Sequence, residues 1–235
     1  MGEFDFSCAK CAVVDKICRS KRGKGPSWCP TLSEEEVFRE AMTHYDDPGI
    51  REFARMASIQ EGSCYANREA QPFVMIPTKS RLEELIEFAK RMNYRRLGMA
   101  FCGGVMHEAS LLTAILESHG FEVVSVSCKV GAIPKERIRV KEEEKVRIGA
   151  FELMCNPIAQ AILLNKSKTE FNIMLGLCIG RDSLFLKYIE GFTTVFAVKD
   201  RVTGHNPLAP LYTSGSYYRR LIGPKGTRQR SVKKT

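Results

Sequence analysis

The sequence predicts an α/β fold: a three-layer domain on a mostly parallel sheet of about four strands, of the Rossmann-like or flavodoxin-like kind. Two observations predict it. Between residues 71 and 200, short apolar runs that are typical of buried strands alternate with amphipathic stretches that are typical of helices. Strands separated by helices pair in parallel, and the helices then cover both faces of the sheet.

The strands are short apolar runs with turn residues at their ends. The first ends at Cys102, where Gly103 and Gly104 turn the chain into a helix that ends at Gly120. A highly charged span, 129–147, predicts an excursion over the surface. The predicted strands are residues 97–102, 121–127, 171–178 and 193–198.

Helix starts in this region carry capping residues. Ser80 and Glu83 have the spacing of a capping box, in which each side chain bonds to the other residue's backbone N–H. Asn156 followed by Pro157 predicts the N-cap and first residue of a second helix. Asp182 is expected to cap a third helix.

Composition and patterning divide the chain into four segments. Ser33 and Glu36 predict a further capping box, at the start of the helical hairpin. A last helix is predicted over 206–222. The segments are a cysteine-rich metal-binding module (1–31), the helical hairpin (32–70), the α/β domain (71–222) and a basic tail (223–235) that we expect to be disordered.

The net charge of +9 is concentrated in two places. Seven bases and no acid lie between Arg219 and Lys234, and five bases lie between Lys16 and Lys24. Basic residues are not interleaved with aromatics along a groove, so we expect no nucleic-acid partner except through the tail. No apolar run approaches the ~20 residues that span a bilayer, so we expect no membrane partner either.

The cysteine content points to metal or catalysis. The first six residues include acids and lack the apolar core of a secretory signal, so a cytoplasmic location is expected. Thiols stay reduced there, and a chain with nine cysteines then more often uses them as ligands or nucleophiles than in disulfides.

A first cysteine group lies in the segment without an apolar core. A C-x2-C pair turns two sulfurs toward one ion, and two more cysteines complete a four-thiolate shell for zinc or an iron–sulfur cluster. Metal binding would then supply the free energy that folds this module. One alternative is redox activity of the C-x2-C pair. The group comprises Cys8, Cys11, Cys18 and Cys29.

A second group is spread along the α/β segment. Cys102, Cys128 and Cys178 each end a predicted strand, and Cys155 lies just before the predicted cap Asn156. Ligands of open parallel sheets bind beyond the carboxyl ends of the strands, so the four cysteines are expected to converge there. The tips of three neighbouring strands span about 10 Å, which suits an iron–sulfur cluster better than a single zinc ion. Alternatively, each cysteine is a small core residue.

Other side chains are weaker candidates. His205 lies just before Asn206-Pro207, as Cys155 lies just before Asn156-Pro157. It is therefore a candidate ligand or proton donor at the carboxyl edge of the sheet. The alternative is a solvent-facing loop residue. Arg181 is a candidate anion ligand. His107 and Glu108 are further candidates, and Cys64 has no assigned role. No P-loop, dinucleotide-binding fingerprint or nucleophile elbow is present, and no catalytic residue is assigned.

With these motifs assembled, the chain resembles a family of uncharacterised, predicted metal-binding proteins of anaerobic bacteria and archaea. The resemblance implies a metal site but no reaction, and the family is expected to carry histidine where this chain has Arg181. It covers residues 6–222 and rests on the N-terminal C-x2-C, the strand before Gly103-Gly104, residues 154–161 with their Cys-Asn-Pro motif, residues 176–185, and residues 199–207.

These expectations favour a protein that binds metal or iron–sulfur centres through cysteine thiolates, for electron transfer or small-molecule redox chemistry. The sequence identifies no partner, and a redox partner is a candidate for such a function. Two alternatives stay open: a binding or regulatory module with structural zinc and a basic tail, or a metal-free protein that uses its thiols for redox or nucleophilic chemistry.

Overall fold

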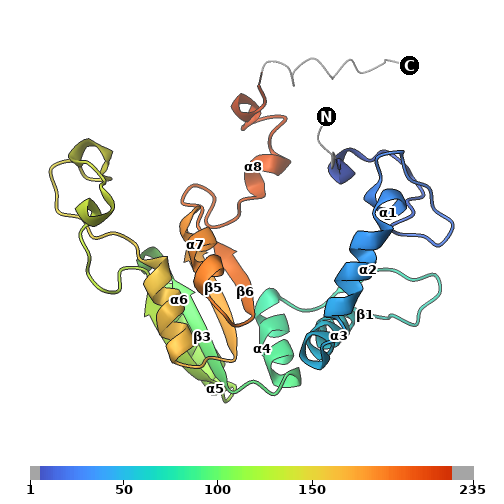
Figure 1. Ribbon diagram of the computed structural model, residues 1–235, viewed down its shortest axis with the longest axis horizontal. Helices are drawn as coiled ribbons and strands as arrows, with labels where there is room; N and C mark the ends of the chain where they lie inside the picture. The colour runs from blue at the N-terminus through green and yellow to red at the C-terminus, as the bar shows by residue number, and fades with distance from the viewer. Residues whose placement is uncertain (1–5, 224–235) are drawn as a thin grey trace. The chain divides into compact units, whose positions relative to one another are not determined.

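The computed structural model describes residues 6–223 of the chain (Figure 1). The chain divides into two compact units, Met1–Ser63 and Cys64–Thr235. The predicted basic tail lies outside the described residues from position 224 onward. Among residues 6–223, no helix combines the length and the apolar character needed to cross a membrane.

The first unit holds the helical hairpin. A 3-10 turn, Cys8–Lys10, precedes it, and its helices are α1 (Pro30–Ser33), α2 (Glu35–His44) and α3 (Pro48–Ser63). Asp47 accepts backbone N–H bonds from Gly49 and Ile50 and thereby caps α3.

The capping box predicted at Ser33 is wrong. Pro30 starts a helical turn earlier than the pattern suggested, so Ser33 is the last residue of α1. Its hydroxyl donates to the Glu34 carboxylate instead, and α2 has no side-chain cap.

The second unit confirms the predicted fold class. Its strands are β3 (Arg96–Phe101), β4 (Glu122–Ser127), β5 (Phe171–Leu177) and β6 (Thr193–Val198). They form one sheet in the order β4-β3-β5-β6, and every pair is parallel. A short antiparallel pair, β1 (Tyr65–Ala66) with β2 (Ile76–Pro77), was not predicted.

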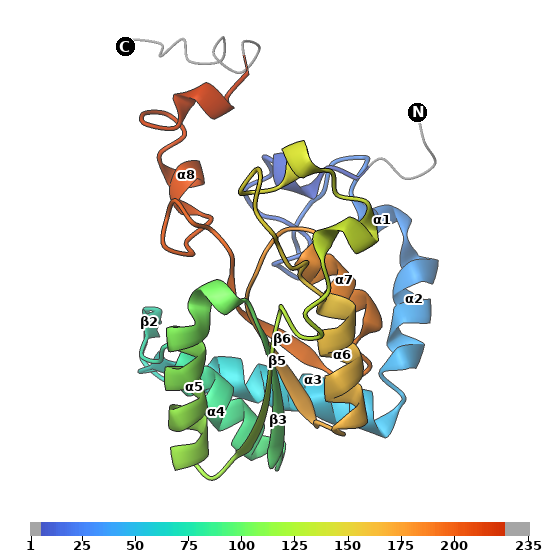
Figure 2. The same cartoon turned by 90° about the vertical axis from the view of Figure 1, so that its left-hand side faces the viewer.

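Helices cover both faces of this sheet (Figure 2). α4 (Arg81–Arg91) and α5 (Met106–Ser118) lie on one face, and α6 (Pro157–Lys166) and α7 (Arg181–Tyr188) on the other. The crossover from β3 to β4 runs in one direction along the sheet, and the crossovers to β5 and β6 run in the opposite direction. Because all such crossovers are right-handed, α5 falls on one face and α6 and α7 fall on the other. The core between the sheet and α6 and α7 is made by Ala100, Val126, Cys128, Ala161, Leu164, Met174, Leu177 and Phe185.

Two of the predicted helix caps are confirmed and one is wrong. Both hydrogen bonds of the Ser80 capping box are present, and the Asn156 side chain accepts from the Ala159 N–H at the start of α6. Asp182 is not the cap of α7, because Gly180 takes that position in a left-handed conformation (φ 79°). Asp182 therefore lies inside the first helical turn.

The segment between β4 and α6 is the predicted excursion. It contains two 3-10 turns, Lys135–Ile138 and Glu142–Glu144, and is held by the buried ammonium of Lys145, which pairs with Glu136 (2.6 Å) and Glu142 (2.7 Å).

The continuous helix predicted over 206–222 is wrong. Only α8 (Ala209–Tyr212) and the 3-10 turn Arg219–Leu221 form there, joined by turns. The Thr-Ser-Gly-Ser run at 213–216 explains the break, since serine and threonine compete for backbone bonds and glycine costs conformational entropy in a helix.

Candidate thiolate site

The carboxyl edge of the sheet gathers cysteines from separate elements. Cys102 follows β3, Cys128 follows β4 and Cys178 follows β5, and each is the first residue beyond its strand. Cys155 precedes Asn156, whose N–H donates to the carbonyl of Cys128 over 2.7 Å. This bond holds the loop that carries Cys155 against the tip of β4.

Cys128 is the centre of a group of three sulfurs. Its side chain is in hydrogen-bond contact with the side chains of both Cys102 and Cys155. Its sulfur also accepts the backbone N–H of Gly103 over 3.3 Å. Only 2% of Cys128 is exposed, so the central sulfur is shielded while its two partners are half-buried.

These contacts separate the acidities of the three thiols. The hydrogen bond from Cys128 lowers the pKa of Cys102 to about 5 and that of Cys155 to about 6. The same two bonds, with burial, raise the pKa of Cys128 far above its usual range. At neutral pH the group therefore consists of two thiolates and one thiol whose single proton they share.

Basic side chains surround these sulfurs. Lys199 and Arg201 lower the pKa of Cys102, and Arg181 and Lys129 lower that of Cys155. Arg201 also donates a hydrogen bond from its guanidinium to the sulfur of Cys178 over 3.1 Å. The pKa of Arg201 is raised by that bond first and also by the charges of Cys102 and Cys155. Arg201 thus lies near three of the four cysteines.

Two glycines, Gly104 and Gly176, lie next to the Lys199 ammonium. The ammonium nitrogen lies 3.5 Å from where a Cβ would stand on Gly104, and the sulfur of Cys102 lies 3.8 Å from that same point. A Cβ on Gly176 would lie 3.6 Å from the same nitrogen. The Lys199 ammonium therefore lies beside both glycines, on the same side of Gly104 as the Cys102 sulfur.

The site lies where the sheet order reverses. From β3 the chain goes outward to β4, and then returns past β3 to β5. Such a reversal opens a crevice between the loops of the two central strands, and ligands of open α/β sheets bind there. Cys102 and Cys178 end the two strands that flank this position.

A buried amide fixes the strand tips beneath the sulfurs. The Gln160 side chain donates to the carbonyls of Phe101 (3.1 Å) and Val126 (2.7 Å), and it is fully buried. It joins β3 and β4 directly below Cys102 and Cys128. The framework under the sulfurs is therefore fixed by hydrogen bonds as well as by packing.

The sulfurs are not arranged as an open metal shell. Within residues 6–223, no three histidine, cysteine, aspartate or glutamate side chains are grouped so that they could hold a metal ion. This covers both the strand-edge cysteines and the N-terminal set, in which Cys8 and Cys18 are exposed and Cys29 is buried. Metal binding at Cys8, Cys11, Cys18 and Cys29 stays a prediction.

The structure places His205 in a backbone turn. Its ring Nδ1 accepts the N–H of Asp200 (3.1 Å), and its own N–H donates to the Asp200 carbonyl. The backbone of His205 is in the left-handed conformation (φ 69°), and the helix expected after it starts only at Ala209. The pattern it shares with Cys155 therefore did not produce the same local structure.

Lys199 and Arg201 belong to the site although no sequence pattern predicted a role for them. They follow Val198, the last residue of β6, and so lie at the same edge as the cysteines. The rule that ligands gather beyond parallel strand ends applies to bases as well as to thiols. Applied to this fourth strand, it would have found both residues.

Comparison with known proteins identifies the family. A family model described as a protein of unknown function, DUF1847, matches residues 29–196, a span that includes all four strand-edge cysteines. An uncharacterised protein of Methanocaldococcus jannaschii, MJ0455, is 44% identical over 176 residues, which is 75% of this chain and 87% of the relative. No solved structure matches significantly. The chain belongs to the DUF1847 family.

Proposed function

We propose that the chain binds a metal or iron–sulfur centre through Cys102, Cys128, Cys155 and Cys178, and uses it for electron transfer or small-molecule redox chemistry. The observation that carries the proposal is the contact between three thiols from separate elements, with the fourth held by a guanidinium that also lies near Cys102 and Cys155.

The protonation states favour soft-metal binding. Thiolate is the form that binds metal, and Cys102 and Cys155 are thiolates at neutral pH. Four thiolates around a cluster leave a negative charge, which Lys199, Arg201, Arg181 and Lys129 would offset. Bases near the sulfurs also raise the potential of a cluster, since they stabilise the reduced state.

Binding requires a local rearrangement. Cys128 must lose its proton, and the sulfurs must move apart until they surround a common centre. The tips of β3 and β4 are tied by Gln160 and by backbone bonds, so we expect the movement to be made by side chains there.

The experiment is metal and sulfide analysis of protein prepared without oxygen, before and after reconstitution with iron and sulfide. Wild type is expected to show iron, sulfide and visible absorption. Cys155→Ser and Cys178→Ser are expected to lose the strand-edge centre, whereas Cys64→Ser, a buried cysteine outside the site, keeps it. Iron and sulfide that remain unchanged in the first two variants would refute the proposal.

The N-terminal cysteines are proposed as a separate zinc or iron–sulfur site. The support is their spacing in a segment where only Cys29 is buried among residues 6–33. In Cys8→Ser/Cys11→Ser protein, the zinc content is expected to fall while the strand-edge centre persists. If this site alone holds metal, the protein fits the alternative of a zinc-bearing binding or regulatory module.

A second candidate is thiol–disulfide chemistry without metal, which the Cys102–Cys128 contact favours. The two residues end adjacent strands whose register pairs Phe101 with Ser127. The Cys102 thiolate would attack a small disulfide such as oxidised glutathione, releasing one glutathione thiolate. Cys128, after losing its proton, would then attack the Cys102 sulfur and release the second. The cysteine pair is oxidised by two electrons and glutathione is reduced.

Mass spectrometry separates the two candidates. Metal-free protein equilibrated in glutathione redox buffers is expected to form a Cys102–Cys128 disulfide if the second candidate holds. A bound centre should block both this disulfide and alkylation of the four strand-edge cysteines. Alkylation that metal does not affect, together with ready disulfide formation, would favour thiol chemistry.

A further inference from the structure

One edge of the sheet has free backbone groups. β4 is the edge strand beside β3. The N–H of Glu122 donates to the carbonyl of Arg95, just before β3, and the N–H of Cys128 donates to the carbonyl of Phe101, the last residue of β3. Backbone groups alternate in direction along a strand, so those of Val123, Ser125 and Ser127 point away from β3. Within residues 6–223, no hydrogen bond joins the N–H groups of these three residues to another part of the chain.

The other edge of the sheet, β6, is partly covered by a side chain of α4. Arg81 of α4 donates to the Val195 carbonyl (3.1 Å) and to the Thr194 hydroxyl (2.7 Å), both in β6. The β5–β6 pairing also contains register shifts, which disturb a regular edge. β4 reads Glu-Val-Val-Ser-Val-Ser, and so it lacks the lysines and prolines that proteins use to block pairing at an exposed edge.

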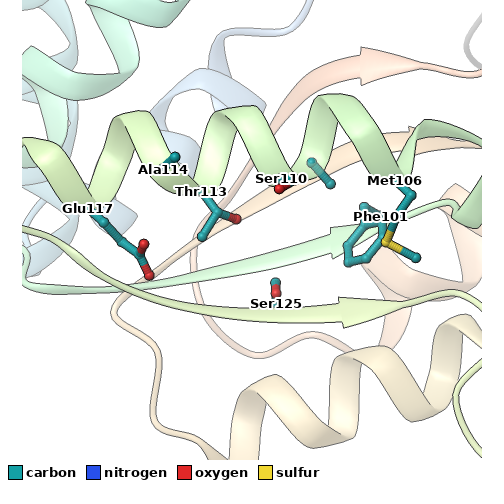
Figure 3. A pocket seen from close by; sticks show the side chains of 8 residues that line it. Phe101, Met106, Ser110, Thr113, Ala114, Glu117 and Ser125 are labelled. Carbon is teal, nitrogen blue, oxygen red and sulfur yellow. The ribbon is translucent and has the colours of Figure 1, made fainter.

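A groove runs beside this edge, between α5 and the β3–β4 pair (Figure 3). Its volume is about 330 Å³, and Ser125 of β4 forms part of its floor. On the α5 side, the groove is lined by one stripe of side chains, which are small at the centre of the stripe and long at its ends. These residues are Met106, Ser110, Thr113, Ala114 and Glu117. Small residues at the centre allow close approach of a second helix.

We propose that this edge pairs with a second copy of the chain, β4 running antiparallel to β4, so that two sheets join into one. A two-fold axis at Ser125 places the outward groups of Ser125 opposite those of Ser125 in the second copy. The same axis places Val123 opposite Ser127. Each outward N–H then faces an outward carbonyl, as an antiparallel ladder requires. The Ser127 carbonyl already accepts the Val130 N–H (3.2 Å), so in the ladder it would accept a second hydrogen bond.

Charge supports a second copy as the occupant. In this register, the Glu122 end of one strand lies beside the Lys129 end of the other. Within one chain, Glu122 already pairs with Arg96 and Lys129 donates to the Leu153 carbonyl, so the charge complementarity comes from α5. The two α5 helices run antiparallel across the axis, which brings the C-terminal turn of one toward the N-terminus of the other.

Glu117 gains most from this arrangement. Within the described part of the chain, its carboxylate has no ion pair or hydrogen bond, and it lies in the last turn of its own helix, where the dipole disfavours an acid. At the N-terminus of the partner helix, the same carboxylate meets the positive end of the dipole, beside the Glu108 that the first turn already holds. The acid is therefore costly in one chain and stabilising in two.

The test is the mass of the full-length protein in solution, by light scattering across a concentration series. Wild type is expected at twice 26.5 kDa, and Ser125→Lys, which sets two ammonium groups against each other on the axis, at 26.5 kDa. Ser58→Lys, at an exposed position on α3, is the matched control and should stay dimeric. Hydrogen exchange should show the amides of Val123 and Ser125 protected in wild type and exposed in Ser125→Lys.

Glu117→Lys separates pairing from folding. Lysine near a helix C-terminus stabilises the isolated helix, so this variant should melt no lower than wild type at concentrations where both are monomeric. The dissociation constant of its dimer should nevertheless be several-fold higher than that of the wild-type dimer. A monomeric wild type overturns the proposal. This holds even if its β4 amides are protected from exchange, because the protection would then come from another segment of the same chain. A dimer that survives Ser125→Lys also overturns it.

Discussion

A guanidinium N–H of Arg201 donates to the sulfur of Cys178 over 3.1 Å. The bond ties the loop after β6 to the tip of β5, so a base from the last strand reaches the cysteine of its neighbour. The same guanidinium lowers the pKa of Cys102, so it offsets negative charge where the cysteines gather.

Removing that guanidinium should make the neighbouring thiols less acidic. Arg201→Leu takes away a positive charge that lowers the pKa of Cys102, and the loss of one nearby charge is typically worth about one pKa unit. Alkylation of Cys102 below pH 5 should then slow by about tenfold. Peptide-resolved mass spectrometry measures the rate at each cysteine, and Arg137→Leu, in the excursion, is the control that should change nothing.

The thiols should differ in their pH profiles. Only thiolate reacts with iodoacetamide, so in metal-free native protein the labelling of Cys102 should be half-maximal near pH 5 and that of Cys155 near pH 6. Below these values the thiols gain protons and labelling stops. Cys128 should stay unlabelled through neutral pH, since its pKa is raised and it is buried.

Denaturation is the control for these profiles. In unfolded protein every thiol has an ordinary pKa of ~8.5, so labelling of Cys102 at pH 6 should fall by about two orders of magnitude. Native Cys102 that titrates like the unfolded thiol would contradict the sulfur contacts.

Gly98→Ala should destabilise the second unit. A Cβ at Gly98 in β3 would lie 2.1 Å from the Oδ1 atom of Asn172, a buried side chain on β5. The strands must shift to relieve the clash, and overpacking of this kind costs about 1–3 kcal/mol. Urea unfolding measures the change. Gly104→Ala meets its neighbours at ordinary contact distances of 3.5 Å and 3.8 Å, and should leave the midpoint nearly unchanged.

The two serines that the sequence predicted as caps should respond differently to alanine. Ser80→Ala removes both hydrogen bonds of the hydroxyl in a complete capping box, and should lower the free energy of unfolding by about 0.5–2 kcal/mol. Ser33→Ala removes an exposed bond to Glu34 and a long bond to the Cys29 carbonyl (3.5 Å) but no cap, and should be close to neutral. Equal losses at the two positions would contradict the assigned helix starts.

Local patterns predicted most of the elements because each depends on neighbouring residues. The Ser80 box, the Asn156-Pro157 start and the four strands are read from spans of a few residues, and the structure agrees within one residue at every end of these strands. The errors at Ser33, Asp182 and 206–222 arose where a proline or glycine nearby moved a helix boundary.

The sequence alone determined that Cys102, Cys128 and Cys178 end strands and that Cys155 precedes a helix, because strand ends and helix starts are local properties. Only the tertiary structure decided which sulfurs touch and which bases reach them. The strand order β4-β3-β5-β6 makes Cys128 a neighbour of Cys102, and a loop contact brings in Cys155. Strand order and the acidity of a thiol depend on contacts between residues far apart in the chain, so only the folded arrangement specifies them.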